Sequence, residues 1–188
     1  PVQLLWINLV AAIALALPLA FEVKEPNVMN RPPRKPDEAL FNGFVTFRVF
    51  FVSILMTVGT IVLFSWEYSY SLSTGMAQTD ALARSQSIAV TFIIFFQIFY
   101  LINCRSLKES VFKIGLFSNG FIFLGIGSIM LLQAMFLYTP FMQKVFGTAS
   151  LDGKSLFISF VAGSLIFVVI SIEKWILREL LNKKKKES

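Results

Sequence analysis

The sequence predicts an all-α membrane protein, a bundle of five transmembrane helices with its N-terminus outside and its C-terminus in the cytoplasm. Composition is the first support. Of the 188 residues, 56% are hydrophobic and 15% are charged, whereas a soluble domain averages about 45–50% apolar and about 25% charged residues. The second support is five segments of roughly 20 mostly apolar residues, each long enough to cross a bilayer as a helix. The third is that Lys and Arg gather on one side of these segments.

The five expected spans follow the apolar runs in chain order. None of these runs alternates apolar and polar residues, as the roughly 10-residue strands of a membrane β-barrel would. The whole chain is therefore expected to form one membrane domain, with a loop at residues 22–43 and a basic tail at residues 177–188. The expected spans cover residues of about 2–21, 44–66, 86–103, 115–137 and 155–176.

Individual spans depart from a plain apolar run. Pro18 removes a backbone donor near the end of the first span, and Arg48 lies one turn inside the second. Glycines in the fourth span, at positions 115, 120, 125 and 127, fit the small-xxx-small packing motif poorly. Aromatic residues near the span ends are expected to anchor the helices at the membrane surfaces. They are Trp6, Trp66, Tyr68, Tyr70, Tyr138 and Trp175.

The basic residues predict the orientation. Of the 17 Lys and Arg, all but Arg84, Lys144 and Lys154 lie on the side of the spans that holds the C-terminus. Positively charged loops remain in the cytoplasm, so this side is expected to be cytoplasmic. The run from Lys183 to Lys186 is interpreted as a topology signal in a solvated tail, and it is equally compatible with attraction to anionic lipid headgroups.

Several kinds of chemistry are excluded by composition. The chain has no His and a single Cys, Cys104, so it cannot hold a His/Cys metal cluster, a Ser-His-Asp triad or an internal disulfide. The net charge is +6, but the 21 Phe residues lie in the apolar runs rather than on a basic face, so no nucleic-acid partner is expected. The expected surroundings are the lipid bilayer.

Polar side chains at membrane depth are costly and often functional. Asn8 and Gln97 lie in the first and third spans, and each is interpreted either as an interhelical hydrogen-bond partner or as an ion ligand. No Asp or Glu lies near the middle of a span, which argues against an independent proton-coupled carrier. A partial ion site completed by helices elsewhere is favoured over a complete one. The other polar residues are Asn103, Gln133, Ser159, Ser164 and Ser171, with Glu173 just past the apolar part of the fifth span.

The first 36 residues read PVQLLWINLVAAIALALPLAFEVKEPNVMNRPPRKP. The opening PVQLLWINL, the acidic-Pro pair at 25–26 and the RPPR at 31–34 occur in the order and spacing of a known family. The chain resembles the C-terminal membrane region, helices six to ten, of P-type cation-transporting ATPases, in particular the calcium-pump-like branch. The resemblance covers essentially the whole chain. Weaker matches are Asn42-Gly43-Phe44, Phe47-Arg48, Gln97 to Asn103, Cys104-Arg105-Ser106 and Glu173-Lys174.

The resemblance implies an ATP-driven cation pump in which ATP phosphorylates an aspartate of a cytoplasmic domain. ATP and Mg²⁺ would then be cofactors of a longer parent chain. These 188 residues contain no DKTGT-like sequence, so neither catalytic nor cofactor-binding residues are expected among them. The implied partners are the transported cation and the parent's N-terminal helices and cytoplasmic domains, in a prokaryotic plasma membrane. The alternative is a non-enzymatic membrane scaffold or interaction subunit.

The resemblance also implies candidate cation ligands. In the calcium-pump pattern the sixth helix holds Asn-x-x-Thr-Asp, and Asn8 matches its Asn, whereas Ala11 and Ala12 replace Thr and Asp. Gln97 stands where the eighth helix of that pattern has a carboxylate. Asn8 and Gln97 are therefore the candidate metal ligands. A standard two-calcium site is not expected, because affinity for divalent cations depends on ligand charge. Three alternatives to a two-calcium site stay open: a site for a single ion, a site for a different cation, and a site whose ligands come mainly from helices four and five.

The loop at residues 22–43 has an implied role of its own. In the family, the connection between helices six and seven lies against the phosphorylation domain and couples it to the membrane. Prolines stiffen the loop, and Arg31, Arg34 and Lys35 are expected to pair with acids of that domain. The alternative interpretation is a stiff turn whose basic residues serve only to set the orientation.

Overall fold

The computed structural model describes residues 2–21, 43–104 and 119–187. Within these ranges every regular element is a helix, which confirms the all-α prediction. The expected coupling residues Arg31, Arg34 and Lys35 lie outside the described residues.

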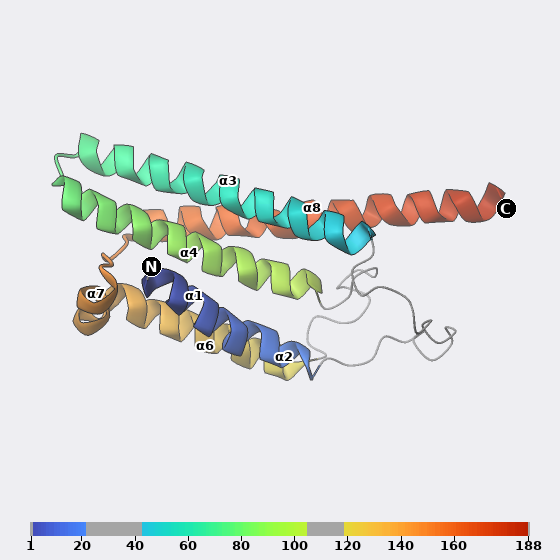
Figure 1. The fold of residues 1–188 in the computed structure, drawn as a ribbon, viewed down its shortest axis with the longest axis horizontal. Helices are drawn as coiled ribbons and strands as arrows, with labels where there is room; N and C mark the ends of the chain where they lie inside the picture. Colours follow the sequence, from blue (N-terminus) through green and yellow to red (C-terminus); the bar gives the residue numbers. More distant parts are fainter. Residues whose placement is uncertain (1, 22–42, 105–118, 188) are drawn as a thin grey trace.

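The helices are numbered in chain order (Figure 1). The first apolar run is a helix in three parts: α1, then a π-helical segment, η1, then α2. Four longer helices, α3, α4, α6 and α8, and the short helix α7 follow. Their bounds are Val2–Ala11 for α1, Ala12–Ala16 for η1, Leu17–Leu19 for α2, Gly43–Ser73 for α3, Gln78–Cys104 for α4, Gly120–Tyr138 for α6, Pro140–Phe146 for α7 and Gly153–Glu187 for α8.

Length and composition allow four of the described helices to cross a membrane. These segments are Val45–Ser73, Gln78–Cys104, Gly120–Tyr138 and Gly153–Ile176, while Val2–Leu15 is a shorter apolar helix. Large apolar side chains such as Leu4, Leu5 and Phe50 are more than 60% exposed. A helix that is apolar all round is typical of a membrane span, because lipid accepts the side chains that the bundle does not bury.

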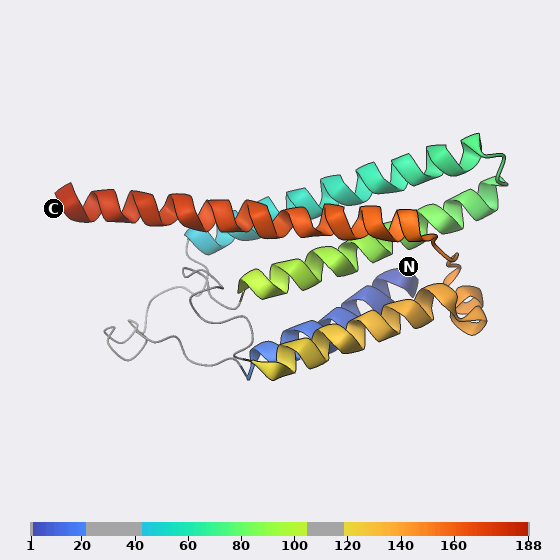
Figure 2. The same cartoon turned by 180° about the vertical axis from the view of Figure 1, so that it is seen from behind.

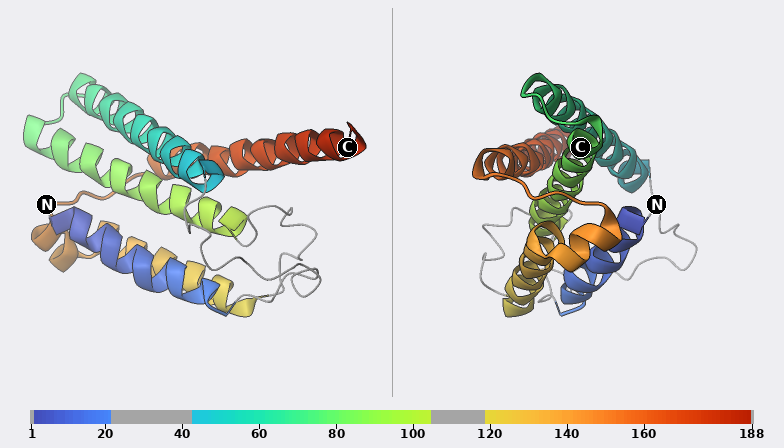
Figure 3. Two further views of the ribbon diagram at one scale, coloured as in Figure 1. Left: turned by 45° about the vertical axis from the view of Figure 1, so that its right-hand side comes forward. Right: turned by 90° about the vertical axis from the view of Figure 1, so that its left-hand side faces the viewer.

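Helix α4 lies between two groups of helices, as the end-on view shows (Figure 3). Helices α3 and α8 pack on one side of it, and the α1–α2 segment with α6 lies on the other (Figures 1 and 2). The core follows this division. Ile94 and Ile98 of α4 pack with Val10 of α1 and Ile129 of α6. On the opposite side of α4, buried Phe and Ile side chains join it to α3 and α8, among them Phe92, Phe96, Ile166 and Ile170.

The two termini lie at opposite ends of the bundle (Figure 1). The end that holds the start of α1, the α3–α4 turn and α7 is called the N-terminal end here, and the other is the C-terminal end. Termini at opposite ends are the arrangement that an odd number of crossings produces.

Two local features extend the sequence predictions. Helix α8 continues to Glu187, so most of the expected tail at residues 177–188 is helical and includes Lys183 to Lys186. Helix α7 was not expected. It begins at Pro140, whose missing N–H is tolerated in a first turn, and it is capped after Phe146 by Gly147, whose φ of 63° is left-handed.

Candidate functional site

Asn8 lies on the exposed side of α1. Ile7 and Val10 are each only 5% exposed and pack into the bundle, whereas Asn8 between them is exposed. No hydrogen bond within the described ranges engages its amide. An amide without a hydrogen bond is costly in an apolar environment, and Asn8 has no hydrogen-bond partner among the described residues.

Gln97 lies on α4 and is half-buried. Its Oε1 is buried and has no hydrogen-bond partner in the described part of the chain. Buried polar atoms in native proteins are nearly always hydrogen-bonded, so such an oxygen requires an explanation. Neither the side-chain oxygen of Asn8 nor that of Gln97 accepts a hydrogen bond from a described residue of another helix. The two side chains are not hydrogen-bonded to each other either.

The segments around these two residues offer neutral oxygens alone. No Asp or Glu occurs in α1, η1 or α2, and Asp80, at the far end of α4, is the single acid of that helix. The described residues contain no group of three or more Asp, Glu or Cys able to hold a metal. Amide and carbonyl oxygens can ligate hard cations, but charge raises the affinity. The described residues can therefore supply only part of a cation site.

Gln133 forms the interhelical bond that Asn8 and Gln97 lack. It is 5% exposed on α6, and its Nε2 donates to Thr91 Oγ1 of α4 at 3.0 Å. Thr91 Oγ1 in turn donates to the carbonyl of Ser87 at 2.7 Å. Through its Nε2, Gln133 is thus a structural link between α4 and α6, while its Oε1, like that of Gln97, is buried without a hydrogen-bond partner in the described part of the chain.

A buried acid at the N-terminal end joins three helices. Glu67 of α3 is 0% exposed and forms an ion pair with Arg84 of α4. Arg84 also pairs with Asp152, which precedes α8, and Ser155 Oγ donates to Glu67 Oε2 at 3.1 Å. From the sequence, Arg84 was expected only to set the orientation, and Glu67 was not predicted as a functional or structural residue. The available signal was an acid at the end of one span and a base at the start of the next, which antiparallel helices bring to the same depth.

A second set of polar contacts joins the same three helices at the C-terminal end. Arg48 Nη2 of α3 donates to Glu173 Oε2 of α8 at 2.6 Å, and Arg48 Nε donates to Oε1 at 3.3 Å. Such a two-point contact between guanidinium and carboxylate is a strong one. Lys174 is 4% exposed, and its Nζ donates to the carbonyl of Asn103 in α4 at 2.6 Å. The α3–α4–α8 group is thus fastened at both ends.

We expect the stabilising effect of Asp152 to disappear in acid. Its hydrogen bond with Ser155 and the charge of Arg84 hold the pKa of Asp152 below its ordinary value. A carboxyl with a lowered folded-state pKa stabilises the fold above its ordinary pKa, about 3.9, and this stabilisation is lost as the pH falls through the lowered value. The difference in melting temperature between the wild type and Asp152→Asn, measured in detergent, should be constant from about pH 7 to 5 and should shrink below about pH 4. If the difference in melting temperature stayed the same down to below about pH 4, the ionised Asp152 carboxylate would not be the stabilising group.

The chain matches a family model and several known proteins. A family model described as "Cation transporting ATPase, C-terminus" matches residues 1–176. The chain is 40% identical over 152 residues to "Probable cation-transporting ATPase F" of Mycobacterium bovis, covering 81% of this chain and 16% of that protein. It is 32% identical over 179 residues to "Calcium-transporting ATPase 1" of Yarrowia lipolytica, covering 95% and 18%.

A more distant relative shows the same coverage. "Calcium-transporting ATPase type 2C member 2" of Mus musculus is 27% identical over 172 residues, which are 92% of this chain and 18% of that protein. The chain therefore spans less than a fifth of the length of the curated relatives it matches. Since the family model covers residues 1–176 and the described helices are those of a membrane bundle, the chain belongs to the cation-transporting ATPases, as the C-terminal membrane region of that family.

Proposed function

We propose that these helices are a membrane-embedded fragment of an ATP-driven cation pump and contribute part of its ion path. The observation that supports this most is the pair of amides without described partners. Asn8 is exposed on α1, and Gln97 has a buried oxygen without a hydrogen bond. A cation held between these oxygens and ligands on other helices of the parent would satisfy both groups.

The proposed site has fewer acids than a standard two-calcium site. Ala11 and Ala12 have no side-chain oxygen to offer, and Gln97 is neutral. The cation and its stoichiometry therefore depend on the parent's other helices. The parent would use ATP and Mg²⁺ in its cytoplasmic domains, and the proposed location is a prokaryotic plasma membrane with the C-terminal end of the bundle in the cytoplasm. The cluster of Lys and Arg near that end supports this orientation.

The experiment that tests this function is a cation screen on the full-length parent. Purified parent is given ATP and Mg²⁺, and phosphoenzyme formation and ATP hydrolysis are measured with added Ca²⁺, Mn²⁺, Na⁺ or K⁺. The proposal predicts that at least one of these cations stimulates both reactions. A parent that forms no phosphoenzyme under any of these conditions would favour the scaffold interpretation instead.

The loop at residues 22–43 is proposed to couple this path to the phosphorylation domain. Neutralising Arg31 and Arg34 together, as Arg31→Gln and Arg34→Gln, should slow turnover of the parent severalfold, because their ion pairs with that domain would be lost. The cation concentration for half-maximal phosphorylation should stay near the wild-type value, since neither residue lies in an expected span. A double variant with the wild-type turnover rate would refute the coupling role.

A further inference from the structure

The segment that follows Asn8 departs from α-helical geometry. Residues Ala12–Ala16 form a π-helical segment, a rare form that occurs frequently at functional sites. Pro18 lies just beyond it and has no N–H, so it cannot donate to the carbonyl of Ala14 four residues earlier. The helix that contains Asn8 thus lacks a regular backbone hydrogen bond just after the π-helical segment. Contacts with neighbouring helices must therefore help to fix its backbone geometry.

Helix α6 lies directly on this weakened segment. A Cβ built on Gly125 would clash with the Ala14 carbonyl oxygen and lie 2.8 Å from Pro18 Cγ. Real Cβ atoms do not approach other atoms this closely, and a backbone carbonyl cannot move aside cheaply. The α-hydrogen that takes the place of the Cβ in glycine therefore points at the Ala14 oxygen, the geometry of a weak C–H···O contact. Only glycine permits this approach.

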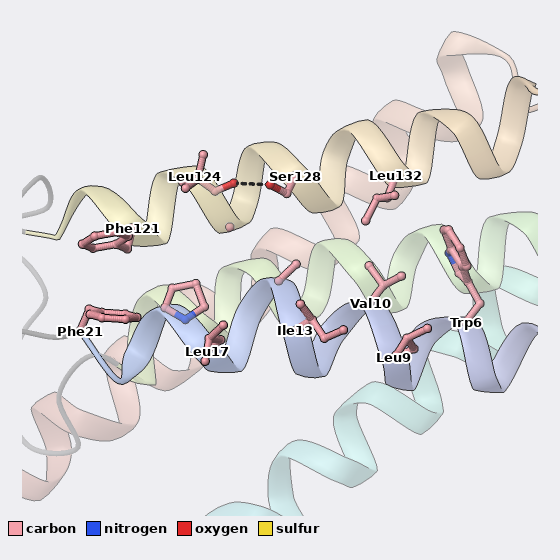
Figure 4. A pocket seen from close by; sticks show the side chains of 13 residues that line it. Trp6, Leu9, Val10, Ile13, Leu17, Phe21, Phe121, Leu124, Ser128 and Leu132 are labelled. Atoms are coloured by element: carbon pink, nitrogen blue, oxygen red, sulfur yellow. Dashed lines mark hydrogen bonds between the residues drawn. The ribbon is translucent and has the colours of Figure 1, made fainter.

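Two further contacts fasten the start of α6 to the same stretch. Asn119 caps α6 by accepting from the N–H of Phe121 at 3.0 Å, and its Nδ2 donates to the carbonyl of Pro18 at 3.2 Å. The rings of Phe21 and Phe121 stack with centroids 4.7 Å apart. Figure 4 shows Phe21 and Phe121 along an apolar groove of about 380 Å³ between the two helices. Asn119 and the first residues of α6 thus contact residues 14–21 at three points.

We propose that Gly125 is a positioning residue for the cation site. By admitting the backbone of α6 to the Ala14 carbonyl, it fixes the π-helical turn, and this turn sets the direction of Asn8 and of the carbonyls that follow it. The inference rests on the proposed function. Helix α6 contains neither candidate ligand, but in this proposal its contact with the π-helical turn determines how α1 orients Asn8 toward the cation.

The test compares two glycines of α6 in the full-length parent. Gly125→Ala places a methyl group against the Ala14 carbonyl, whereas Gly127→Ala is the matched control, because nothing lies within 4 Å of a Cβ at Gly127. We expect Gly125→Ala to raise the cation concentration for half-maximal phosphorylation by about tenfold, since small displacements of a positioned group are costly. The maximal phosphoenzyme level of the folded protein should be preserved, and Gly127→Ala should match the wild type.

A second variant keeps the inference testable if Gly125→Ala does not fold. Pro18→Ala restores an N–H that can donate to the Ala14 carbonyl and removes the ring that contacts Gly125. It should also raise the half-maximal cation concentration, and adding Gly125→Ala to it should have a smaller effect than Gly125→Ala alone, because coupled contacts are not additive.

The outcomes separate this inference from the proposed function. If folded Gly125→Ala or Pro18→Ala protein has the wild-type cation dependence, Gly125 serves packing alone and the inference is wrong. Equal effects of Gly125→Ala and Gly127→Ala would overturn it as well. A wild-type parent without cation-stimulated phosphorylation would contradict the proposed function, and this inference with it.

Discussion

Arg84→Gln is expected to lower the free energy of unfolding by about 3–5 kcal/mol, the range seen when one partner of a buried ion pair is removed. The reason is Glu67, which is 0% exposed and whose charge is balanced by Arg84. Without Arg84, the described contacts of Glu67 reduce to the hydroxyls of Ser155 and Ser71, at 3.1 and 3.5 Å. Thermal unfolding in detergent, followed by circular dichroism, measures the effect.

Two comparisons distinguish the buried pair from a general effect of charge. Lys144→Gln removes a positive charge from the same end of the bundle, but Lys144 is exposed, so the melting temperature should change little. Adding Glu67→Gln to Arg84→Gln should recover much of the lost stability, because the buried charge is then gone as well. If Arg84→Gln were no more destabilising than Lys144→Gln, the structural role assigned to this network would be wrong.

Gln97→Glu is expected to increase the parent's affinity for divalent cations. The substitution adds a negative charge to a side chain whose oxygen is buried and unpartnered in the described residues, and the affinity of oxygen sites for such cations rises with ligand charge. The Ca²⁺ concentration for half-maximal phosphorylation should fall by about tenfold. Stimulation by Na⁺ or K⁺, where the wild type shows it, should change less, because these ions have half the charge.

The matched control is Gln86→Glu, the same chemical change on the same helix. Gln86 lies at the N-terminal end of the bundle, where its Oε1 accepts from Gln3 Nε2 at 3.2 Å, a bond that a carboxylate also accepts. It should leave the Ca²⁺ dependence near that of the wild type. If both variants shifted the affinity equally, the effect would be a long-range field and Gln97 would not be a ligand.

Composition and apolar runs were sufficient to predict the helical bundle, because crossing a bilayer requires long apolar helices whatever their neighbours. They could not predict the ends of the helices in the same way. Helix α8 runs past its apolar part to Glu187, since Lys and Glu are good helix formers and the hydropathy of a segment does not decide where its helix stops. Helix α7 was missed for the opposite reason, because seven residues are too few for a periodic pattern.

The pairing of charges depends on depth and rotation, which a single sequence does not state. Arg48 and Glu173 are 125 residues apart and meet only because α3 and α8 pack against the same helix. Glu67 lies just past an apolar run, where the sequence is as consistent with a solvent-exposed acid as with a buried one. The sequence did indicate Asn8 and Gln97 as candidate ligands. The approach of Gly125 to Ala14 could not be predicted from the sequence. The expected fourth span contains four glycines, and only the contacts of the described ones show which of them packs against a neighbouring backbone.

The most direct test of the central claim, that α1 contributes to the cation path, is the cation dependence of phosphorylation in the parent with Asn8→Ala. The exposed Leu5→Ala on the same helix serves as the control. If Asn8 is a ligand, Asn8→Ala should raise the cation concentration for half-maximal phosphoenzyme formation by about tenfold or more, with expression and folding near those of the control. A cation dependence identical to that of the wild type, in a protein expressed as well as the control, would contradict the account.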